Sequence, residues 1–160
     1  MADVTATTDP SAAFTTARVA VGILYFDQSS RVLLVKPTYK DYLDIPGGYV
    51  DKGESPIGAL RREIHEELRA PLPIGPVLVV DWAPWDEGDK ILFVFDGGVL
   101  TNDQIASIHV DGVEIAEIEF HHPDRLDDIL IPRLARRLKA ALAVRDSTHM
   151  AYLENGSAAS

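Results

Sequence analysis

Two apolar segments separated by a short polar turn constrain the fold of this chain more than any other feature of its sequence. The first, RVAVGILYF, covers residues 18–26, and the second, RVLLVK, covers residues 31–36. Both are rich in β-branched residues, and the intervening residues 27–30, DQSS, have the composition of a turn. The pattern predicts a pair of β-strands.

Later segments extend this pair into a mixed architecture. Further strands are expected over residues 76–82, 90–96 and 114–121, where apolar and β-branched residues are concentrated. A helix is expected over residues 132–144, after a shorter helical turn over residues 123–130. With one helix between strands and another at the end, the order of elements predicts an α+β fold in which helices cover a mixed sheet.

The segment from Pro56 to Arg69 carries the signals of an amphipathic helix. Ser55 can cap its first turn, and Pro56 suits the first helical position because the N–H that proline lacks would have no partner there. Apolar residues recur at spacings of three and four and predict one buried stripe, formed by Ile57, Leu60, Ile64 and Leu68.

The length and the two ends of the chain define the expected domain. A chain of 160 residues corresponds to about one domain. We expect it over residues 17–145, between a disordered N-terminal tail, residues 1–16, and a flexible C-terminal tail, residues 146–160, since both ends are rich in Ala, Ser and Thr. The N-terminal tail lacks the basic start and apolar stretch of a signal peptide, and no apolar run reaches the roughly 18 residues of a membrane span. These features favour a cytoplasmic protein that does not bind membranes.

The net charge limits the partners that the chain can bind. Lys and Arg number 15 against 25 Asp and Glu, and the resulting net charge of -10 has the wrong sign for a long nucleic acid. A small phosphorylated substrate is compatible with this charge when a cation lies between its phosphates and the acidic protein. The absence of cysteine excludes disulfides, thiolate metal sites and cysteine nucleophiles.

Three glutamates crowd one arc of the helix over residues 56–69. With Glu63 at zero, Glu66 lies at about 300° and Glu67 at about 40°, beside the apolar stripe. Like charges at this spacing destabilise a helix by a few tenths of a kcal/mol per pair, on the order given by model helices. The cluster is either a solvated acidic face relieved by neighbouring arginines, or a site for a hard divalent cation.

Residues 48–70, GYVDKGESPIGALRREIHEELRA, place these glutamates in a longer pattern. The segment resembles the Nudix box, the signature of the Nudix hydrolases, and the matching positions are Gly48, Glu54, Arg62, Glu63, Ile64, Glu66 and Glu67. Six matches at charged or glycine positions arise by chance in about one chain in 10⁵ of this length. The residues Ile45-Pro46-Gly47-Gly48 also resemble the segment that leads into the box in this family.

The segment departs from the box at its end. The closing glycine of the pattern is Arg69 here, and the last aliphatic residue is only Ala70. Because that glycine normally ends the helix and turns the chain, the substitution affects the expected turn rather than the metal ligands, and Pro71 can end the helix instead. Leu43 stands near the position where relatives often carry a large aromatic residue.

The resemblance implies the Nudix fold, an α/β/α sandwich with a mixed β-sheet packed between helices. It implies that Glu63, Glu66 and Glu67 bind Mg²⁺, for which Mn²⁺ can substitute, or that Glu63 is instead the base that deprotonates the attacking water. A cation held there would neutralise the charge of a diphosphate while activating the water. In this context the solvated acidic face becomes the less favoured interpretation of the glutamates.

Other residues of the segment receive roles from the same resemblance. Arg62 would orient the glutamates, and Glu54 would pair with Arg62 across the loop. Gly47 and Gly48 would let the backbone approach the metal and the pyrophosphate closely. Relatives often recruit a further acidic ligand or base from outside the box, and we favour Glu114, at the start of a strand, over Glu117, Glu119, Asp86, Glu87 and Asp89.

Aromatic residues are the candidates for substrate binding. Trp85 lies in the turn-rich segment DWAPWDEGDK and could stack on a base, which is worth about 1–3 kcal/mol, although packing in the core would explain a tryptophan beside a strand equally well. Tyr42 precedes the box and could touch a phosphate or ribose, or only pack on the surface.

The function favoured by these residues is metal-dependent hydrolysis of a nucleoside diphosphate linked to another group. The substrate would be a nucleoside triphosphate, a nucleotide sugar or a compound of the ADP-ribose type, with water attacking a pyrophosphate phosphorus. The alternative is a catalytically silent Nudix-like module that binds a nucleotide as a sensor, and it is disfavoured because such a module need not keep the ligand glutamates. A diphosphate isomerase of this fold requires a cysteine that the chain lacks. The resemblance also allows a homodimer.

Overall fold

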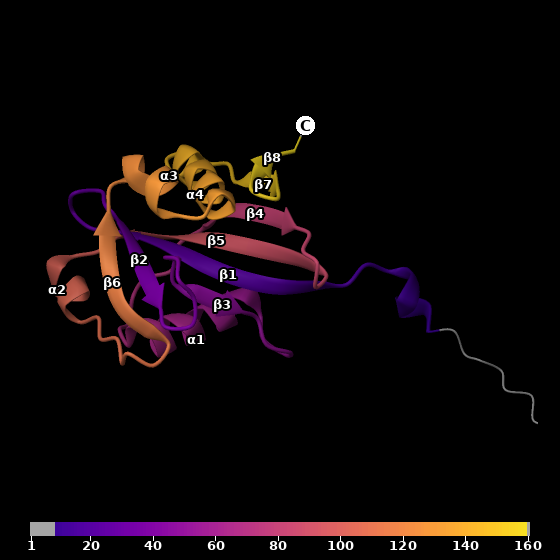
Figure 1. Cartoon of the computed structure of the whole chain (residues 1–160), viewed down its shortest axis with the longest axis horizontal. Coiled ribbons are helices and arrows are strands. Elements are labelled where there is room, and N and C mark those ends of the chain that lie inside the picture. Colours follow the sequence, from indigo (N-terminus) through magenta and orange to yellow (C-terminus); the bar gives the residue numbers. More distant parts are fainter. Residues whose placement is uncertain (1–8, 160) are drawn as a thin grey trace, which may run out of the picture.

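A mixed β-sheet lies between two layers of helices in the computed structural model, which describes residues 9–159 (Figure 1). The strands are β1 (Ala17–Phe26), β2 (Val32–Pro37), β3 (Gly47–Tyr49), β4 (Val77–Ala83), β5 (Asp89–Val99), β6 (Ile115–His121), β7 (Ala151–Glu154) and β8 (Ser157–Ala158). The helices are α1 (Pro56–Leu68), α2 (Asn102–Ala106), α3 (Leu126–Ile129) and α4 (Pro132–Val144), with short 3₁₀ turns at Pro10–Ala13 and Pro123–Arg125. The predicted α+β sandwich with a mixed sheet is confirmed.

The strands follow the order β6-β2-β1-β5-β4-β7-β8, and β3 pairs with β1 outside this path. The pairs β1–β5 and β4–β7 are parallel, whereas β1–β2, β1–β3, β2–β6, β4–β5 and β7–β8 are antiparallel. The predicted strands and the two predicted long helices are present, while β3, α2, β7 and β8 were not expected.

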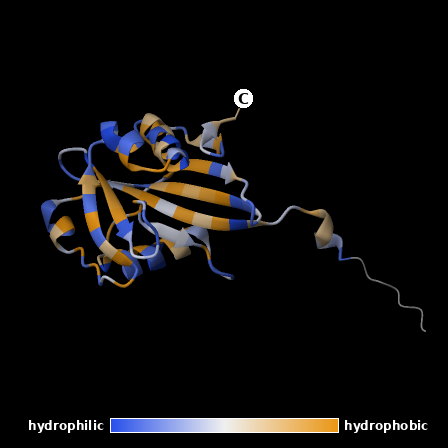
Figure 2. Cartoon of the chain, viewed as in Figure 1, coloured by the Kyte–Doolittle hydropathy of each residue, from blue (hydrophilic) through white to orange (hydrophobic). Residues whose placement is uncertain are grey.

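Strand β1 is buried on both faces, which explains its nearly continuous apolar sequence. Leu24 and Phe26 pack into the core beneath α3 and α4, whereas Ile23 and Tyr25 pack into the core above α1. This division follows from the alternation of side chains along a strand. Figure 2 shows the resulting hydrophobic centre of the sheet, with hydrophilic segments on the outer helices.

Helix α1 begins as the sequence predicts. The hydroxyl of Ser55 accepts a hydrogen bond from the N–H of Gly58 (3.1 Å), and Leu60, Ile64 and Leu68 are buried against the sheet. The expectation that Ile57 belongs to the buried stripe is wrong, since this side chain is 41% exposed. It lies in the first turn, beside a loop whose residues 51–53 are exposed.

Helix α1 ends in the turn that the box normally builds with glycine. Arg69 adopts the left-handed conformation (φ 51°, ψ 32°), and its N–H donates to the carbonyl of His65 (3.1 Å). Its guanidinium donates to Asp111 (2.8 Å). The helix therefore stops at residue 69 rather than at Pro71, at the cost of a conformation that disfavours residues with a Cβ atom by roughly 1–2 kcal/mol.

The two predicted tails have different outcomes in the structure. Residues 1–8 of the predicted N-terminal tail lie outside the described residues. The expectation of a flexible tail over residues 146–160 is wrong for residues 151–158, since β7 runs parallel to β4 and folds back into β8. Asn155 (φ 54°) and Gly156 (φ 77°) form the two-residue turn of this hairpin, in the left-handed conformation that Asn-Gly turns favour. Within residues 9–159, no helix is long and apolar enough to span a membrane.

Candidate active site

The carboxylate of Glu67 is buried at the end of α1. Its Oε2 accepts a hydrogen bond from the N–H of Gly47 in β3 (2.9 Å). Burial, helped by the negative charges of Glu63, Asp44 and Glu114 and opposed by the hydrogen bond from Gly47, raises the pKa of Glu67 to about 8. Several carboxylates therefore lie close enough together for each to disfavour the ionisation of Glu67.

Glu63 lies directly against the backbone of Gly48. A Cβ atom at position 48 would overlap the carboxylate of Glu63, so glycine at this position allows the close approach. Burial raises the pKa of Glu63, an effect that the hydrogen bond from Arg62 Nη1 (2.8 Å) opposes. Gly47 meets a different constraint, because its φ is 145° and a Cβ atom there would overlap the backbone of Val21.

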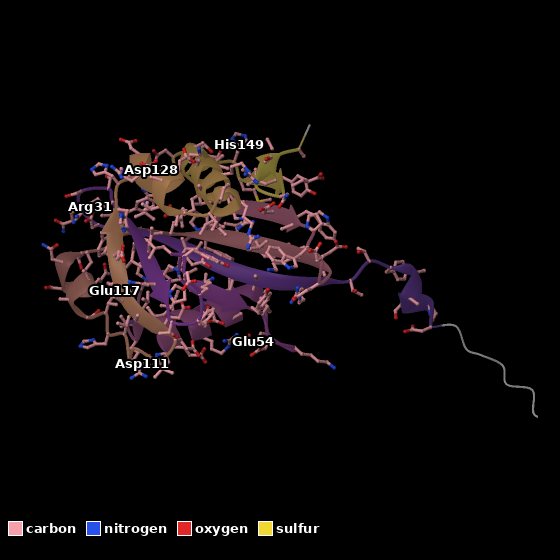
Figure 3. All side chains as sticks on the ribbon, in the orientation of Figure 1. Arg31, Glu54, Asp111, Glu117, Asp128 and His149 are labelled. Carbon is pink, nitrogen blue, oxygen red and sulfur yellow. The ribbon has the colours of Figure 1, made fainter. Side chains whose placement is uncertain are left out.

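Arg62 links Glu54 to the glutamates of α1. Its Nε and Nη2 donate to the two carboxylate oxygens of Glu54 (2.8 and 2.9 Å), and Nη2 also donates to the carbonyl of Tyr49 (3.0 Å). Its Nη1 donates to Glu63 and, at 3.2 Å, to Glu66. The Arg62 hydrogen bonds hold the pKa of Glu54 at about 2. The predicted pairing of Glu54 with Arg62 is confirmed, and Figure 3 shows Glu54 on the α1 side of the sheet.

A cleft of about 490 Å³ lies between the sheet, the loop before β3 and the start of α4. Gly47, Gly48 and Glu67 contribute to one part of its wall, and Tyr42 and Trp85 contribute to another. All four residues predicted to bind substrate therefore line the same cleft. Trp85 is 43% exposed, so packing in the core does not account for it.

Positively charged side chains gather in this cleft although the chain as a whole is acidic. The guanidinium of Arg133 lies 4.1 Å from the ring centre of Trp85, and the ammonium of Lys90 lies 5.4 Å from it. Lys40 lies 4.7 Å from the ring centre of Tyr42, and Arg18 also lines the cleft. The cleft therefore offers cationic groups and aromatic faces side by side, with Asp44, Glu67 and Glu87 as its acidic residues.

The acidic residues outside the box separate into two groups. Glu114 lies just before β6, and its charge raises the pKa of both Glu63 and Glu67, so it lies near them. Four of the other candidates bind other partners. Glu117 pairs with Lys36 (3.1 Å), Glu119 with His121 (2.6 Å) and Glu87 with Arg18 (3.5 Å), and Asp89 accepts from Thr15 (3.2 Å).

The reasoning from sequence missed several residues of the cleft, among them Asp44 and Asn155. Asp44 accepts hydrogen bonds from Lys40 (2.5 Å) and from the N–H of Ile45 (2.8 Å), and its charge raises the pKa of Glu67. Its position directly before the Ile-Pro-Gly-Gly segment was the available signal. Asn155 also lines the cleft, and the Asn-Gly pair between two β-forming segments could have revealed its turn.

The donor set at the end of α1 fits a hard divalent cation. Such cations bind carboxylate oxygens, and Glu67 is a buried carboxylate whose only hydrogen bond among the described contacts comes from Gly47. Among residues 9–159, no three carboxylate or imidazole groups converge closely enough to hold a metal ion in the present arrangement. Arg62 engages Glu63 and Glu66, so these carboxylates would have to turn toward Glu67 for the three to share a cation.

Comparisons with known proteins identify the family of the chain. The family model described as NUDIX domain matches residues 16–143. A "Putative 8-oxo-dGTP diphosphatase" of Bacillus subtilis (strain 168) is 31% identical over 116 residues, which cover 72% of this chain and 74% of that protein.

Solved structures agree with the fold. The MutT protein from Methanosarcina mazei Go1 superimposes with a TM-score of 0.70 at 19% identity, covering 83% of this chain and 98% of that one. A UDP-X diphosphatase superimposes with a TM-score of 0.72 at 21% identity, covering 91% and 70%. The chain therefore belongs to the NUDIX domain family.

Proposed function

We propose that this chain uses a divalent cation to hydrolyse the diphosphate linkage of a small nucleotide. The observation that carries the proposal is the buried carboxylate of Glu67, which lies in the wall of a cleft that also gathers cationic and aromatic side chains. A carboxylate in this setting gains from a bound cation, and the cationic side chains suit a phosphorylated ligand.

Glu66 and Glu67 would hold the cation, Mg²⁺ or alternatively Mn²⁺, and Glu63 would be either a third ligand or the base. When bound, the cation neutralises diphosphate charge and lowers the pKa of a coordinated water. Glu66 makes the longer of the two Arg62 Nη1 contacts, 3.2 Å, so it is the carboxylate that can leave Arg62 at the smaller cost. Arg62 would keep its place meanwhile, because Glu54 and the carbonyl of Tyr49 still accept its other N–H groups.

The proton of the attacking water requires a base close to the glutamates. Glu63 is our first candidate, since burial raises its pKa toward the range in which a carboxylate accepts a proton at neutral pH. Glu114 is the second candidate, either as base or as a further ligand, because its charge acts on Glu63 and Glu67. Gly48 supports Glu63 by leaving room for its carboxylate.

The other part of the cleft would bind the rest of the substrate. Trp85 offers an exposed ring on which a base can stack, a contact worth about 1–3 kcal/mol. Lys40 beside Tyr42, together with Arg18 and Lys90, would contact phosphate or ribose oxygens. These groups suit a substrate that has a nucleoside at one end and a diphosphate at the other.

The substrate class that we propose is a nucleoside diphosphate linked to a further group. The names of the relatives support this class, since one is called an 8-oxo-dGTP diphosphatase and another a UDP-X diphosphatase. Nucleoside triphosphates, including oxidised ones, nucleotide sugars and ADP-ribose all belong to it. A homodimer stays a prediction that light scattering on the purified chain would test.

The test is release of phosphate or pyrophosphate with Mg²⁺ across a panel of these compounds. We expect turnover of at least one of them, its loss in EDTA, and its loss in the variant Glu67→Gln. The matched control is Glu117→Gln, which removes a carboxylate that pairs with Lys36 on the sheet and should keep full activity. Saturable nucleotide binding without turnover of any compound in the panel would instead favour a sensor module.

A further inference from the structure

The hairpin formed by β7 and β8 brings a residue from the far end of the chain into the substrate cleft. The NUDIX match ends at residue 143, before the hairpin begins. Asn155, in the turn of the hairpin, nevertheless lines the same cleft as Trp85, Arg133 and Glu67. Figure 1 shows the hairpin beside β4 on the α4 side of the sheet.

The backbone of Asn155 is fixed on two sides. Its N–H donates to the carbonyl of Trp82 at the end of β4 (2.8 Å), and its carbonyl accepts from Nη2 of Arg136 in α4 (3.0 Å). These contacts tie the turn both to the strand that leads to Trp85 and to the helix that carries Arg133. The position of Asn155 relative to the cleft is therefore set by main-chain contacts.

A buried ion pair holds the second residue of the turn. The N–H of Gly156 donates to Oδ1 of Asp81 (3.0 Å), whose Oδ2 accepts from Nε of Arg137 (2.6 Å). Asp81 is fully buried, at 0% exposure. A Cβ atom on Gly156 would lie 2.8 Å from the carbonyl oxygen of Arg133, so the turn packs directly on the first turn of α4. Such a turn is a rigid part of the cleft wall.

The carboxamide of Asn155 is available to a ligand. Among the side-chain hydrogen bonds within residues 9–159, none uses this carboxamide, although its backbone groups are paired. A carboxamide presents one donor group and one acceptor in a fixed arrangement, which matches the edge of a nucleobase. Stacking on Trp85 accepts any base, so discrimination among bases needs a polar group of this kind nearby.

We propose that Asn155 is a specificity-determining residue, whose carboxamide binds the hydrogen-bonding edge of the nucleobase that stacks on Trp85. The proposal rests on the proposed function only in taking the ligand to be a nucleotide. It assigns the recognition of the base to a hairpin outside the part of the chain that matches the family model.

A purely structural role for Asn155 makes a different prediction. Asparagine tolerates the left-handed conformation, and that property alone would suit it to the turn. Glycine and aspartate tolerate the same conformation, so Asn155→Gly and Asn155→Asp keep the turn while removing or altering the carboxamide. If the turn alone mattered, neither change would affect base preference.

The experiment measures the dissociation constants of AMP, GMP, CMP and UMP for the full chain by calorimetry. We expect the wild type to prefer one base by about tenfold or more, the effect of a good bidentate contact. Asn155→Gly should reduce this preference to about threefold or less, and Asn155→Asp should change the order of the bases. The control Ser157→Ala, an exposed residue in the same hairpin, should leave all four constants unchanged.

The possible results separate this inference from the proposed function. Equal affinities for the four bases in the wild type, or an unchanged preference in both Asn155 variants with an intact thermal transition, would overturn the inference. These binding constants need no catalysis, so a base preference that depends on Asn155 would stand even if no compound in the hydrolysis panel were turned over. Conversely, turnover that Glu67→Gln abolishes would support the hydrolase whether or not Asn155 reads the base.

Discussion

Replacing Gly48 with alanine tests whether Glu63 must lie where the structure places it. The added Cβ atom would overlap the carboxylate of Glu63, which is the end of a flexible side chain. Gly48 is not among the glycines with positive φ, so alanine is compatible with its backbone. We therefore expect a folded protein in which the Glu63 carboxylate is displaced.

The magnitude follows from the size of that displacement. The carboxylate must retreat by about 1 Å to reach an ordinary van der Waals distance, and a misplacement of this size costs about 10²-fold in rate. The hydrogen bond from Arg62 Nη1 (2.8 Å) would be strained at the same time. The effect should fall mainly on kcat, since the groups that would bind the nucleoside, such as Trp85, are untouched.

The assay compares kcat, KM and the thermal transition of wild type and Gly48→Ala, with the substrate that the hydrolysis panel identifies. The control Gly58→Ala makes the same substitution in α1, where the new Cβ would meet Ser55 Oγ at 3.2 Å and lies away from Glu63. Wild-type turnover by Gly48→Ala would refute the reasoning. An equal loss in Gly58→Ala would show that the loss reflects the fold of α1 rather than the position of Glu63.

Three further predictions concern stability. Arg69→Gly should raise the free energy of unfolding by a few tenths to about 1 kcal/mol in urea titrations. The strain relieved at the left-handed position exceeds the stabilisation lost with the exposed Arg69–Asp111 ion pair. A lower free energy of unfolding in the variant would contradict the assigned strain. Arg137→Ala should lower the free energy of unfolding by about 3–5 kcal/mol by leaving Asp81 buried without its cation, and a change below about 1 kcal/mol would count against that pair. Burial alone would raise the pKa of Asp27, but hydrogen bonds from Arg31 and Ser29 outweigh it and lower the pKa. Its contribution is then present above the unfolded pKa of about 4 and is lost as the pH falls through the folded value, so Asp27→Asn should cost about 1–3 kcal/mol at pH 7 and progressively less as the pH falls below about 4.

The parts of the fold that the sequence predicts correctly depend on local signals. The apolar runs that became β1 and β2, and the cap and stripe of α1, are each determined by residues close together in the chain. Ile57 fits the same stripe and is nevertheless exposed, because burial depends on what packs against the first turn and not on helical spacing alone. Strand β3 has only three residues, two of them glycine, so it carries no strand pattern of its own.

The C-terminal hairpin shows the limit of composition as a guide. Residues 146–160 are polar and rich in small residues, which is typical of a tail. What orders the hairpin over residues 151–158 is remote in sequence, since β4 pairs with β7 and Asp81 binds the N–H of Gly156 across 75 positions. The local Asn-Gly signal indicates a turn, but only the contacts with β4 and α4 decide that this turn reaches the cleft.

The distinction between local sequence signals and contacts between remote segments also applies to the two parts of the candidate site. Apart from Glu114, the groups proposed for chemistry come from one continuous segment, because a helix places residues 63, 66 and 67 on one arc and the preceding loop returns Glu54 to Arg62. The groups proposed for recognition come from separate segments around Tyr42, Trp85, Arg133 and Asn155, which meet only in the folded chain. A change in the hairpin or in the loop before β5 can therefore alter which nucleotide binds without moving the glutamates. This explains why one sequence motif identifies the reaction class while the substrate must be sought in contacts between distant segments.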